Sequence, residues 1–319
     1  MSLPPLLSRL RLPVIASPMF ILSTPALVIA QCKAGIVGSM PALNARPAAL
    51  LDDWLAEITE TLAAHDAAHP DQPAAPFAIN QIVHKSNPRL DEDMALCEKY
   101  KVPLIITSLG ARTDVNEAVH RWGGLVLHDI INNTFARKAV EKGADGVIAV
   151  AAGAGGHAGT ISPFALVQEI RQWFDGLLAL SGSIATGRAV LAAQAMGADV
   201  GYIGSAFIAT EEANAVPAYK QMVCDSSSED IVYSNLFTGV HGNYLKGSIL
   251  QAGLDPEALA HSDASKMDFG AMLSGSKAWK DIWGCGQGIG AVQQVVPAGQ
   301  VVARLAREYD EARRQLCGG

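Results

Sequence analysis

Short runs of hydrophobic residues recur along the first part of the chain, and segments with a helical pattern separate them. A near-continuous apolar run of this length is typical of a parallel strand that is covered on both faces. The runs lie at residues 14–16, 35–40, 77–83, 104–109, 125–130, 146–151, 177–181 and 200–207. We therefore predict eight parallel strands.

The segments between these runs carry the start and stop signals of helices. Residues 134–143 and 186–197 both combine apolar positions at helical spacing with a terminal glycine. A longer helix is predicted from Pro47 to about His65. Strand–helix alternation repeated in this way predicts an α/β fold, a (β/α)₈ TIM barrel. An open doubly wound sheet is the alternative that periodicity alone leaves open.

The pattern changes after residue 222. Residues 224–230 are a polar break, and residues 236–290 are rich in glycine without strand periodicity. We interpret residues 223–296 as a mostly helical, Gly-rich cap or insertion over one mouth of a barrel formed by residues 1–222. Residues 298–315 have the spacing of an amphipathic helix, so that residues 297–319 are expected to return to the barrel.

Composition narrows the class of protein. Half of the 319 residues are hydrophobic and 17% are charged, which favours a large core over disorder. A net charge of −7 without a basic block disfavours nucleic acid and anionic membranes as partners. The five scattered cysteines indicate reduced thiols in a cytoplasmic protein. Pro13, Pro18 and Pro25 interrupt the only apolar run near the N-terminus that could act as a signal peptide.

In a barrel of this kind, function gathers at the C-terminal ends of the strands, and phosphate binds after strands seven and eight. The residues at these two ends are Ser181, Gly182, Ser183, Gly204 and Ser205. Glycine lets backbone N–H groups approach an anion, and serine adds hydroxyl donors. Helices that open near residues 185 and 210 would add favourable dipole ends. We predict a phosphate cradle here, with ordinary turn glycines as the alternative.

The most unusual local feature is the loop of residues 153–159, in which four glycines surround His157. Each glycine costs backbone entropy, so this composition makes sense if the backbone lies against a flat ligand. A histidine titrates near neutrality and can therefore take or give a proton. We predict that His157 is catalytic; a flexible surface loop with an incidental histidine is the alternative.

The other histidines give weaker signals. His128 lies in the fifth predicted strand, where a buried structural role is as compatible with the pattern as a role in the site. Surface or structural roles are expected for His65, His69, His84, His120, His241 and His261. No HxxxH pattern or Cys/His cluster indicates a metal site.

Several of these motifs, in this order, resemble the nitronate monooxygenase family, also known as 2-nitropropane dioxygenase-like flavoproteins. The resemblance covers about residues 10–220. Residues 13–19 look like the first strand of the family, and residues 77–80 look like its third strand. Residues 143–145 followed by 154–159 resemble its catalytic-histidine signature. Residues 181–183 and 196–212 look like its phosphate-binding end.

The resemblance implies FMN as cofactor and oxidation of alkyl nitronates by O₂ to a carbonyl compound and nitrite, with His157 as base or orienting group. Gln287 and Gly288 are hypothesised to reach the flavin from the C-terminal region. Together with the strand-end rule, this predicts a cofactor site formed by Ser17, Pro18, Met19, Asn80, Ser108, His128, Asp129, Ala152, Gly155, Gly156, Ser181, Gly182, Ser183, Gly204, Ser205, Gln287 and Gly288.

The sequence departs from the family pattern at Asp129, where members of one subgroup carry a lysine near the flavin pyrimidine. A lysine would stabilise negative charge on the ring, whereas an aspartate would oppose it unless it were protonated or turned away. Segments 233–235, 241–244 and 283–288 also depart from it, which leaves the substrate open. An NAD(P)H-dependent FMN reductase of quinones or enoyl thioesters and a flavin-free barrel lyase or isomerase are kept as alternatives. The expected partners are a small-molecule substrate and O₂, and a homodimer is left open.

Overall fold

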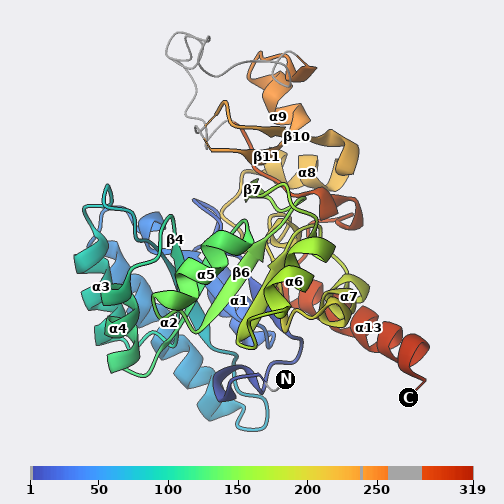
Figure 1. The fold of residues 1–319 in the computed structure, drawn as a ribbon. Helices are drawn as coiled ribbons and strands as arrows, with labels where there is room; N and C mark the ends of the chain where they lie inside the picture. Colours follow the sequence, from blue (N-terminus) through green and yellow to red (C-terminus); the bar gives the residue numbers. More distant parts are fainter. Residues whose placement is uncertain (1–2, 238–239, 258–281, 319) are drawn as a thin grey trace.

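The computed structural model describes residues 3–237, 240–257 and 282–318 of the chain (Figure 1). Eight parallel strands form one sheet in the order β1-β9-β8-β6-β5-β4-β3-β2. Ile15 and Val37 pair across the remaining gap between β1 and β2, which closes the sheet into a barrel. The strands are β1 (Val14–Ala16), β2 (Gly38–Pro41), β3 (Phe77–Ile82), β4 (Leu104–Ser108), β5 (Leu125–Ile130), β6 (Gly146–Val150), β8 (Leu177–Ser181) and β9 (Val200–Ile203).

Helices surround the strands in Figure 1, as the alternating pattern predicts. They are α1 (Pro25–Lys33), α2 (Leu50–Ala68), α3 (Leu90–Lys99), α4 (Thr113–Arg121), α5 (Asn133–Glu141), α6 (Pro163–Arg171), α7 (Gly187–Met196) and α13 (Ala298–Cys317), whereas α8 (Pro217–Asp225) lies at one end of the barrel. Short 3₁₀ helices are η1 (Pro5–Leu7), η2 (Ala42–Asn44), η3 (Ser205–Phe207), η4 (Ser228–Asp230) and η5 (Gln287–Ala291). In the described part of the chain, we find no helix with the length and apolar character needed to span a membrane.

The ends of the helices follow their local sequence. The Thr186 side chain accepts a hydrogen bond from the Ala189 amide and caps α7, which ends at Gly197 in a left-handed conformation. Asn132 caps α5 in the same way. One expected helix start, near residue 210, is wrong. Strand β9 ends at Ile203 and continues as η3, and Thr210 pairs with Val296 instead.

The C-terminal segment contains strands that its composition did not indicate. Strands β10 (Ile231–Ser234) and β11 (Gly242–Leu245) pair antiparallel, and β11 also pairs with the short strand β7 (Gly156–His157). These strands lie with α9 (Lys246–Gln251) at one end of the barrel (Figure 1). Each strand is too short for an alternating pattern to be recognised in the sequence. In β11, Gly242 and Asn243 also interrupt the hydrophobic pattern. The boundary expected at residues 222–223 falls inside α8.

The interior of the barrel is apolar at its centre and polar toward the C-terminal ends of its strands. Ile15, Val37, Ala78, Ile106, Leu127, Ile148, Ala179 and Tyr202 belong to one buried cluster. Successive side chains of a strand alternate between faces, so the residue two positions on also faces inward. These next residues, here called the upper layer, are Ser17, Ser39, Asn80, Ser108, Asp129, Val150, Ser181 and Gly204.

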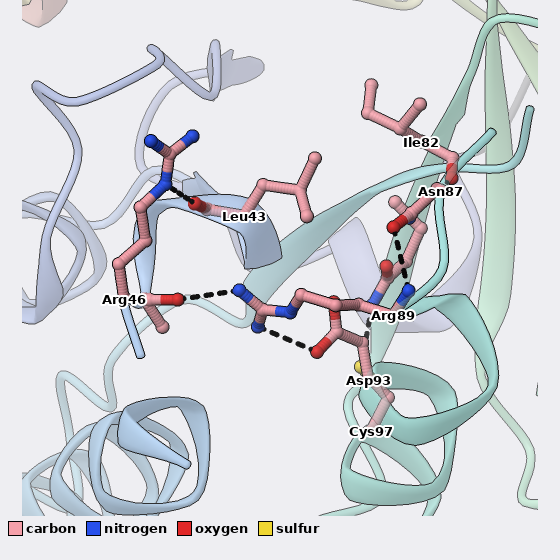
Figure 2. A network of polar contacts seen from close by, with 9 residues as sticks. Leu43, Arg46, Ile82, Asn87, Arg89, Asp93 and Cys97 are labelled. Atoms are coloured by element: carbon pink, nitrogen blue, oxygen red, sulfur yellow. Dashed lines mark hydrogen bonds and ion pairs between the residues drawn. The ribbon is translucent and has the colours of Figure 1, made fainter. Parts of the chain in front are cut away.

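Polar contacts fix the loops that follow β2 and β3 (Figure 2). The Arg89 guanidinium donates to the Ala45 carbonyl at 2.7 Å and pairs with the Asp93 carboxylate at 2.8 Å. Asn87 donates to the Ile82 carbonyl at 2.8 Å, at the end of β3. Burial raises the pKa of Asp93, and the adjacent Arg89 opposes that shift. The network holds the strand-end loops in place on this side of the barrel mouth.

Candidate functional site

A shallow hollow lies at the C-terminal ends of β8 and β9, where the phosphate cradle is predicted. Four stretches of the chain meet there: the glycine-rich loop after β6, the turn after β8, the turn after β9, and the start of η5. The lining residues are Gly153, Ala154, Gly155, Ser181, Gly182, Ser183, Ile184, Ala185, Tyr202, Gly204, Ser205, Gly286 and Gly288. All five residues of the predicted cradle are among them.

The glycines of the cradle are required by close backbone approach. Gly153 has a φ of +84°, and a Cβ atom there would lie 2.1 Å from the Ser183 hydroxyl oxygen. A Cβ on Gly155 would lie 2.8 Å from the Gly286 nitrogen, and one on Gly286 would lie 2.7 Å from the Gly153 carbonyl oxygen. The three glycines therefore let these backbones pack directly against one another and against Ser183.

The donor set of the cradle suits a phosphate group. Its described lining residues carry no charged side chain, so an anion would be held by backbone N–H groups and serine hydroxyls. Helix α7 begins a few residues after the Ser183 turn. Its N-terminus adds a favourable dipole. A phosphate monoester, such as that of FMN, fits this arrangement.

Residues from the β1 and η5 ends complete the same region. A Cβ on Gly204 would lie 3.2 Å from the Ser17 Cβ and 3.9 Å from the Met19 Cγ. The amide of Gln287 donates to the Gly153 carbonyl at 2.9 Å. A Cβ on Gly288 would lie 3.0 Å from the Ser183 carbonyl carbon. The structure thus brings Gln287 and Gly288 to the cradle.

The upper layer of the barrel contains a directed hydrogen-bond chain. The Asn80 amide donates to the Ser108 hydroxyl at 2.8 Å, and that hydroxyl donates to the Asp129 carboxylate at 2.5 Å. Burial raises the pKa of Asp129 to about 6, although the bond from Ser108 acts in the opposite direction. Asp129 therefore faces the interior and is not turned away.

Tyr202 connects this chain to the cradle. Tyr202 lines the hollow. Burial and the charge of Asp129 raise the pKa of the Tyr202 hydroxyl, and a hydrogen bond with Ser17 opposes that shift. The Asp129 carboxylate therefore lies close enough to the cradle wall to be felt electrostatically.

His157 lies on β7, in register with Gly242 of β11. Its side chain is exposed, yet desolvation by the surrounding loop lowers the pKa of the imidazole below 6.5. A neutral imidazole is therefore the main form at pH 7, and this form can accept a proton.

The loop around His157 is held by the C-terminal segment. The Asn243 side chain donates to the Ala154 carbonyl at 2.6 Å. The Tyr233 hydroxyl donates to the Ala158 carbonyl at 3.0 Å, and the Ala158 amide donates to the His241 carbonyl at 3.1 Å. The position of His157 is thus set from outside the barrel.

His128 is separated from the other predicted site residues. It lies between the inward-facing Leu127 and Asp129 and so points to the helix side of the barrel, where its Nδ1 is 2.7 Å from the Thr107 hydroxyl oxygen. Burial, and then the positive charge of Lys142, lower its pKa to about 4. Its position is that of a neutral histidine in a structural role.

The remaining predicted residues surround the cradle more loosely. A Cβ on Gly182 would lie 2.8 Å from the Ala152 carbonyl oxygen, so Ala152 backs the turn. Gly156 pairs with Asn243 in the small sheet. Pro18 is half-buried between Ser17 and Met19 on the β1 loop.

Sequence reasoning missed residues that act across long separations. Asn44 holds the β1 loop by donating to the Met19 and Ser23 carbonyls at 3.0 and 2.8 Å and by accepting from the Ile21 amide at 2.8 Å. His241 was assigned a surface or structural role, and its ring stacks on Tyr233 beside the His157 loop with 5.1 Å between centroids. His261 lies outside the described residues. In the sequence, the only sign that this part of the chain contacts the site is the group of polar residues next to a glycine in segment 241–244.

No group of three side chains suited to holding a metal ion occurs in the ranges that the structure describes.

Known proteins are similar to this chain in sequence and fold. The model of the nitronate monooxygenase family matches residues 5–308. A nitronate monooxygenase of Paraburkholderia phytofirmans is 25% identical over 95% of this chain and 94% of its own length. Among solved structures, FabK from Thermotoga maritima superposes with a TM-score of 0.79 at 25% identity, covering 98% of this chain and 97% of that one. Nitroalkane oxidase from Streptomyces ansochromogenes gives 0.77 at 25% identity, covering 96% and 98%.

Proposed function

Because the chain belongs to the nitronate monooxygenase family, we propose that it binds FMN and uses it with O₂ to oxidise alkyl nitronates to a carbonyl compound and nitrite. Membership of this family makes the chain a flavin-dependent oxidoreductase and sets aside a flavin-free lyase or isomerase. When bound, FMN would take electrons from the substrate and pass them to O₂.

The observation that carries the proposal is the pairing of a phosphate cradle with a glycine-wrapped histidine at one barrel mouth. Ser181, Ser183 and Ser205 would hold the FMN phosphate together with the backbone amides of the adjacent turns. Gly153 and Gly155 let the loop backbone pack closely against Ser183 and Gly286, which would bring the loop to the edge of the bound cofactor.

The residues of the upper layer would face the ring from the interior of the barrel. Ser17, Asn80 and Ser108 offer polar groups at the inward ends of β1, β3 and β4. They would fix the orientation of the ring by hydrogen bonds at its polar edge.

His157 would act on the substrate. With a nitronate, its imidazole would orient the anionic nitro group. With a neutral nitroalkane, the unprotonated nitrogen would take the α-proton and leave the nitronate in the site. The lowered pKa supports the second role, because it keeps the imidazole unprotonated at neutral pH.

The test uses anaerobic mixing of the purified, FMN-loaded chain with propionate 3-nitronate or nitroethane, followed by the visible spectrum. We expect the flavin band to bleach and to return on admission of air with release of nitrite. His157→Asn should slow nitroethane turnover by about 100-fold or more, the usual worth of a general base. His84→Asn, in an exposed loop after β3, is the matched control. An unreduced flavin, or nitroethane turnover that His157→Asn leaves unimpaired, would overturn the assignment.

An NAD(P)H-dependent FMN reductase of quinones or enoyl thioesters is the second candidate. The similarity to FabK favours keeping it, because the TM-score of 0.79 is as high as that for nitroalkane oxidase, 0.77. This candidate expects NADH or NADPH to bleach the flavin rapidly under argon. A nitronate oxidase is expected to respond to the nitronate and to leave the pyridine nucleotides unused.

A further inference from the structure

Asp129 is the one carboxylate among the described residues of the upper layer, and the proposed reaction leaves it without a role. It accepts the Ser108 hydroxyl proton on Oδ2, and Ser108 in turn accepts from the Asn80 amide. The second Asn80 amide proton goes to the Ile106 carbonyl at 3.1 Å. Both donors of Asn80 are therefore used, and the chain has one direction, from β3 through β4 to β5.

This direction identifies where a proton can be added. The side chains of Asn80 and Ser108 do not titrate near neutral pH. The Asp129 carboxylate is therefore the only group of this three-residue hydrogen-bond chain that can gain a proton there. Ser108 donates to the Asp129 Oδ2 atom, so the Oδ1 atom is left to carry an added proton. The Asp129 residue keeps partial contact with solvent, from which that proton can come.

The neighbours of Asp129 do not supply a counter-charge. The other residues of the upper layer and Tyr202, one layer below, share the barrel interior with it, and within the described part of the chain none of them carries a positive charge. Of these only Tyr202 titrates, and its raised pKa keeps it neutral. His128, next along β5, points to the opposite face of the barrel. A negative charge that appeared beside Asp129 would therefore meet a second negative charge and no positive one.

We propose that Asp129 is the proton-accepting residue of the flavin site, gaining one proton from solvent when bound FMN gains electrons. The proposal rests on the function proposed above, since it requires FMN at the barrel mouth. Oxidation of the nitronate with one water molecule to the carbonyl compound and nitrite releases two electrons and two protons, and the ring would take both electrons and one of the protons. The second proton forms the Asp129 carboxylic acid, so the charge left on the ring is matched by a charge removed from the protein. Asp129 would change the charge beside the ring and would form no bond with the substrate.

The site chemistry supports this reading of a residue that departs from the family pattern. A carboxylate held near its titration point at neutral pH changes charge at little cost when its surroundings change. Burial places Asp129 in that range, with a pKa of about 6. A lysine at the same place would supply a fixed positive charge, whereas Asp129 would lose a negative charge as the ring gains electrons.

The experiment measures the midpoint potential of the bound flavin as a function of pH, between pH 5 and 8.5, for the FMN-loaded chain and for Asp129→Asn. Above about pH 6 we expect the potential of the natural chain to fall more steeply by about 30 mV per pH unit, the two-electron equivalent of one proton. Below that pH the two slopes converge, because Asp129 is then protonated in both states. Asp175→Asn, an exposed carboxylate that precedes β8, should keep the natural slope.

An independent signature covers the case in which Asp129→Asn binds FMN poorly. The reduced-minus-oxidised infrared spectrum of the natural chain should gain a carboxylic-acid carbonyl band that shifts in D₂O. In Ser108→Ala the pH at which the steep slope begins should rise, because the carboxylate loses its donor. Equal slopes in the natural chain and Asp129→Asn, or no such band, would overturn the proposal while leaving FMN binding intact. A chain that binds no FMN would overturn the proposed function itself, and this proposal with it.

Discussion

At Gly153 the backbone has a φ of +84°, and an added Cβ atom would lie 2.1 Å from the Ser183 hydroxyl. Gly153→Ala should therefore destabilise the chain by about 2 kcal/mol or more, from left-handed strain plus steric overlap. It should also weaken FMN binding at the adjacent cradle. Urea unfolding and fluorescence titration with FMN measure the two effects.

Gly299→Ala is the control for this substitution. Gly299 lies in α13 with no atom within 4 Å of its added Cβ, so alanine should stabilise the helix by up to about 1 kcal/mol. Unchanged FMN affinity in Gly153→Ala would show that the loop does not lie against the cofactor.

The lowered pKa of His157 has a consequence for the pH profile. Because desolvation lowers the pKa below 6.5, the imidazole is unprotonated at pH 7 and becomes protonated only in more acid solution. Turnover of nitroethane, which needs the base, should fall only in acid solution, at a lower pH than an ordinary imidazole would give. Turnover of propionate 3-nitronate, which has no α-proton to lose, should fall less. A ratio of the two rates that does not change with pH would argue against the base role.

Strand β5 carries two titrating residues on opposite faces, and their effects on stability have opposite signs. His128 has a pKa of about 4 in the folded chain against an ordinary value of 6.5, so the unfolded chain binds its proton first as the pH falls. Asp129 has a pKa of about 6 against 3.8, so the folded chain binds that proton first. Each proton is worth about 1.4 kcal/mol per pH unit.

Between pH 6 and 4 these two contributions nearly cancel in the natural chain. Asp129→Asn removes the stabilising one, so its free energy of unfolding should drop by about 3 kcal/mol more than that of the natural chain over this range. Urea unfolding of the FMN-free proteins at half-unit pH steps checks this, with Asp175→Asn as control. Parallel pH curves for Asp129→Asn and the natural chain would contradict the opposed titrations.

At the scale of the whole molecule, helix α13 ties the C-terminus to the cradle. Glu308 accepts the Gly187 amide at 2.8 Å at the start of α7 and pairs with Arg304 at 2.7 Å. Arg304 also donates to the Ala185 carbonyl at 3.2 Å. Glu308→Ala should cost about 1–2 kcal/mol of stability, since it leaves the Gly187 amide without its acceptor. Thermal unfolding measures the loss, and Glu311→Ala on the exposed face should leave the melting temperature unchanged.

The barrel was predictable because its information is local. Eight apolar runs mark eight strands, and the turn after β8 and the loop around His157 stand out through their glycines alone. The facing of His128 and Asp129 was not predictable from the run in which both lie, because a buried strand is apolar on both sides. Asn44 contacts the β1 loop across 21 to 25 residues of sequence, and Gly286 contacts Ser205 across 81, distances that no local pattern reports. Strands β10 and β11 are four residues each. Strand β11 pairs with β7 on one side and with β10 on the other, and no local pattern records these partners.

The pairing of β7 with β11 has a consequence for building chimaeras from this scaffold. The backbone of His157 belongs to a strand of the small sheet. The position of the histidine therefore depends on residues 231–245, which supply the strands paired with it. Grafting residues 231–245 from a relative onto this barrel would leave the foreign strand facing a loop shaped for another partner. An exchange of substrate preference between relatives therefore has to transplant residues 153–159 and 231–245 as a pair, although about 70 residues of barrel separate them in the sequence.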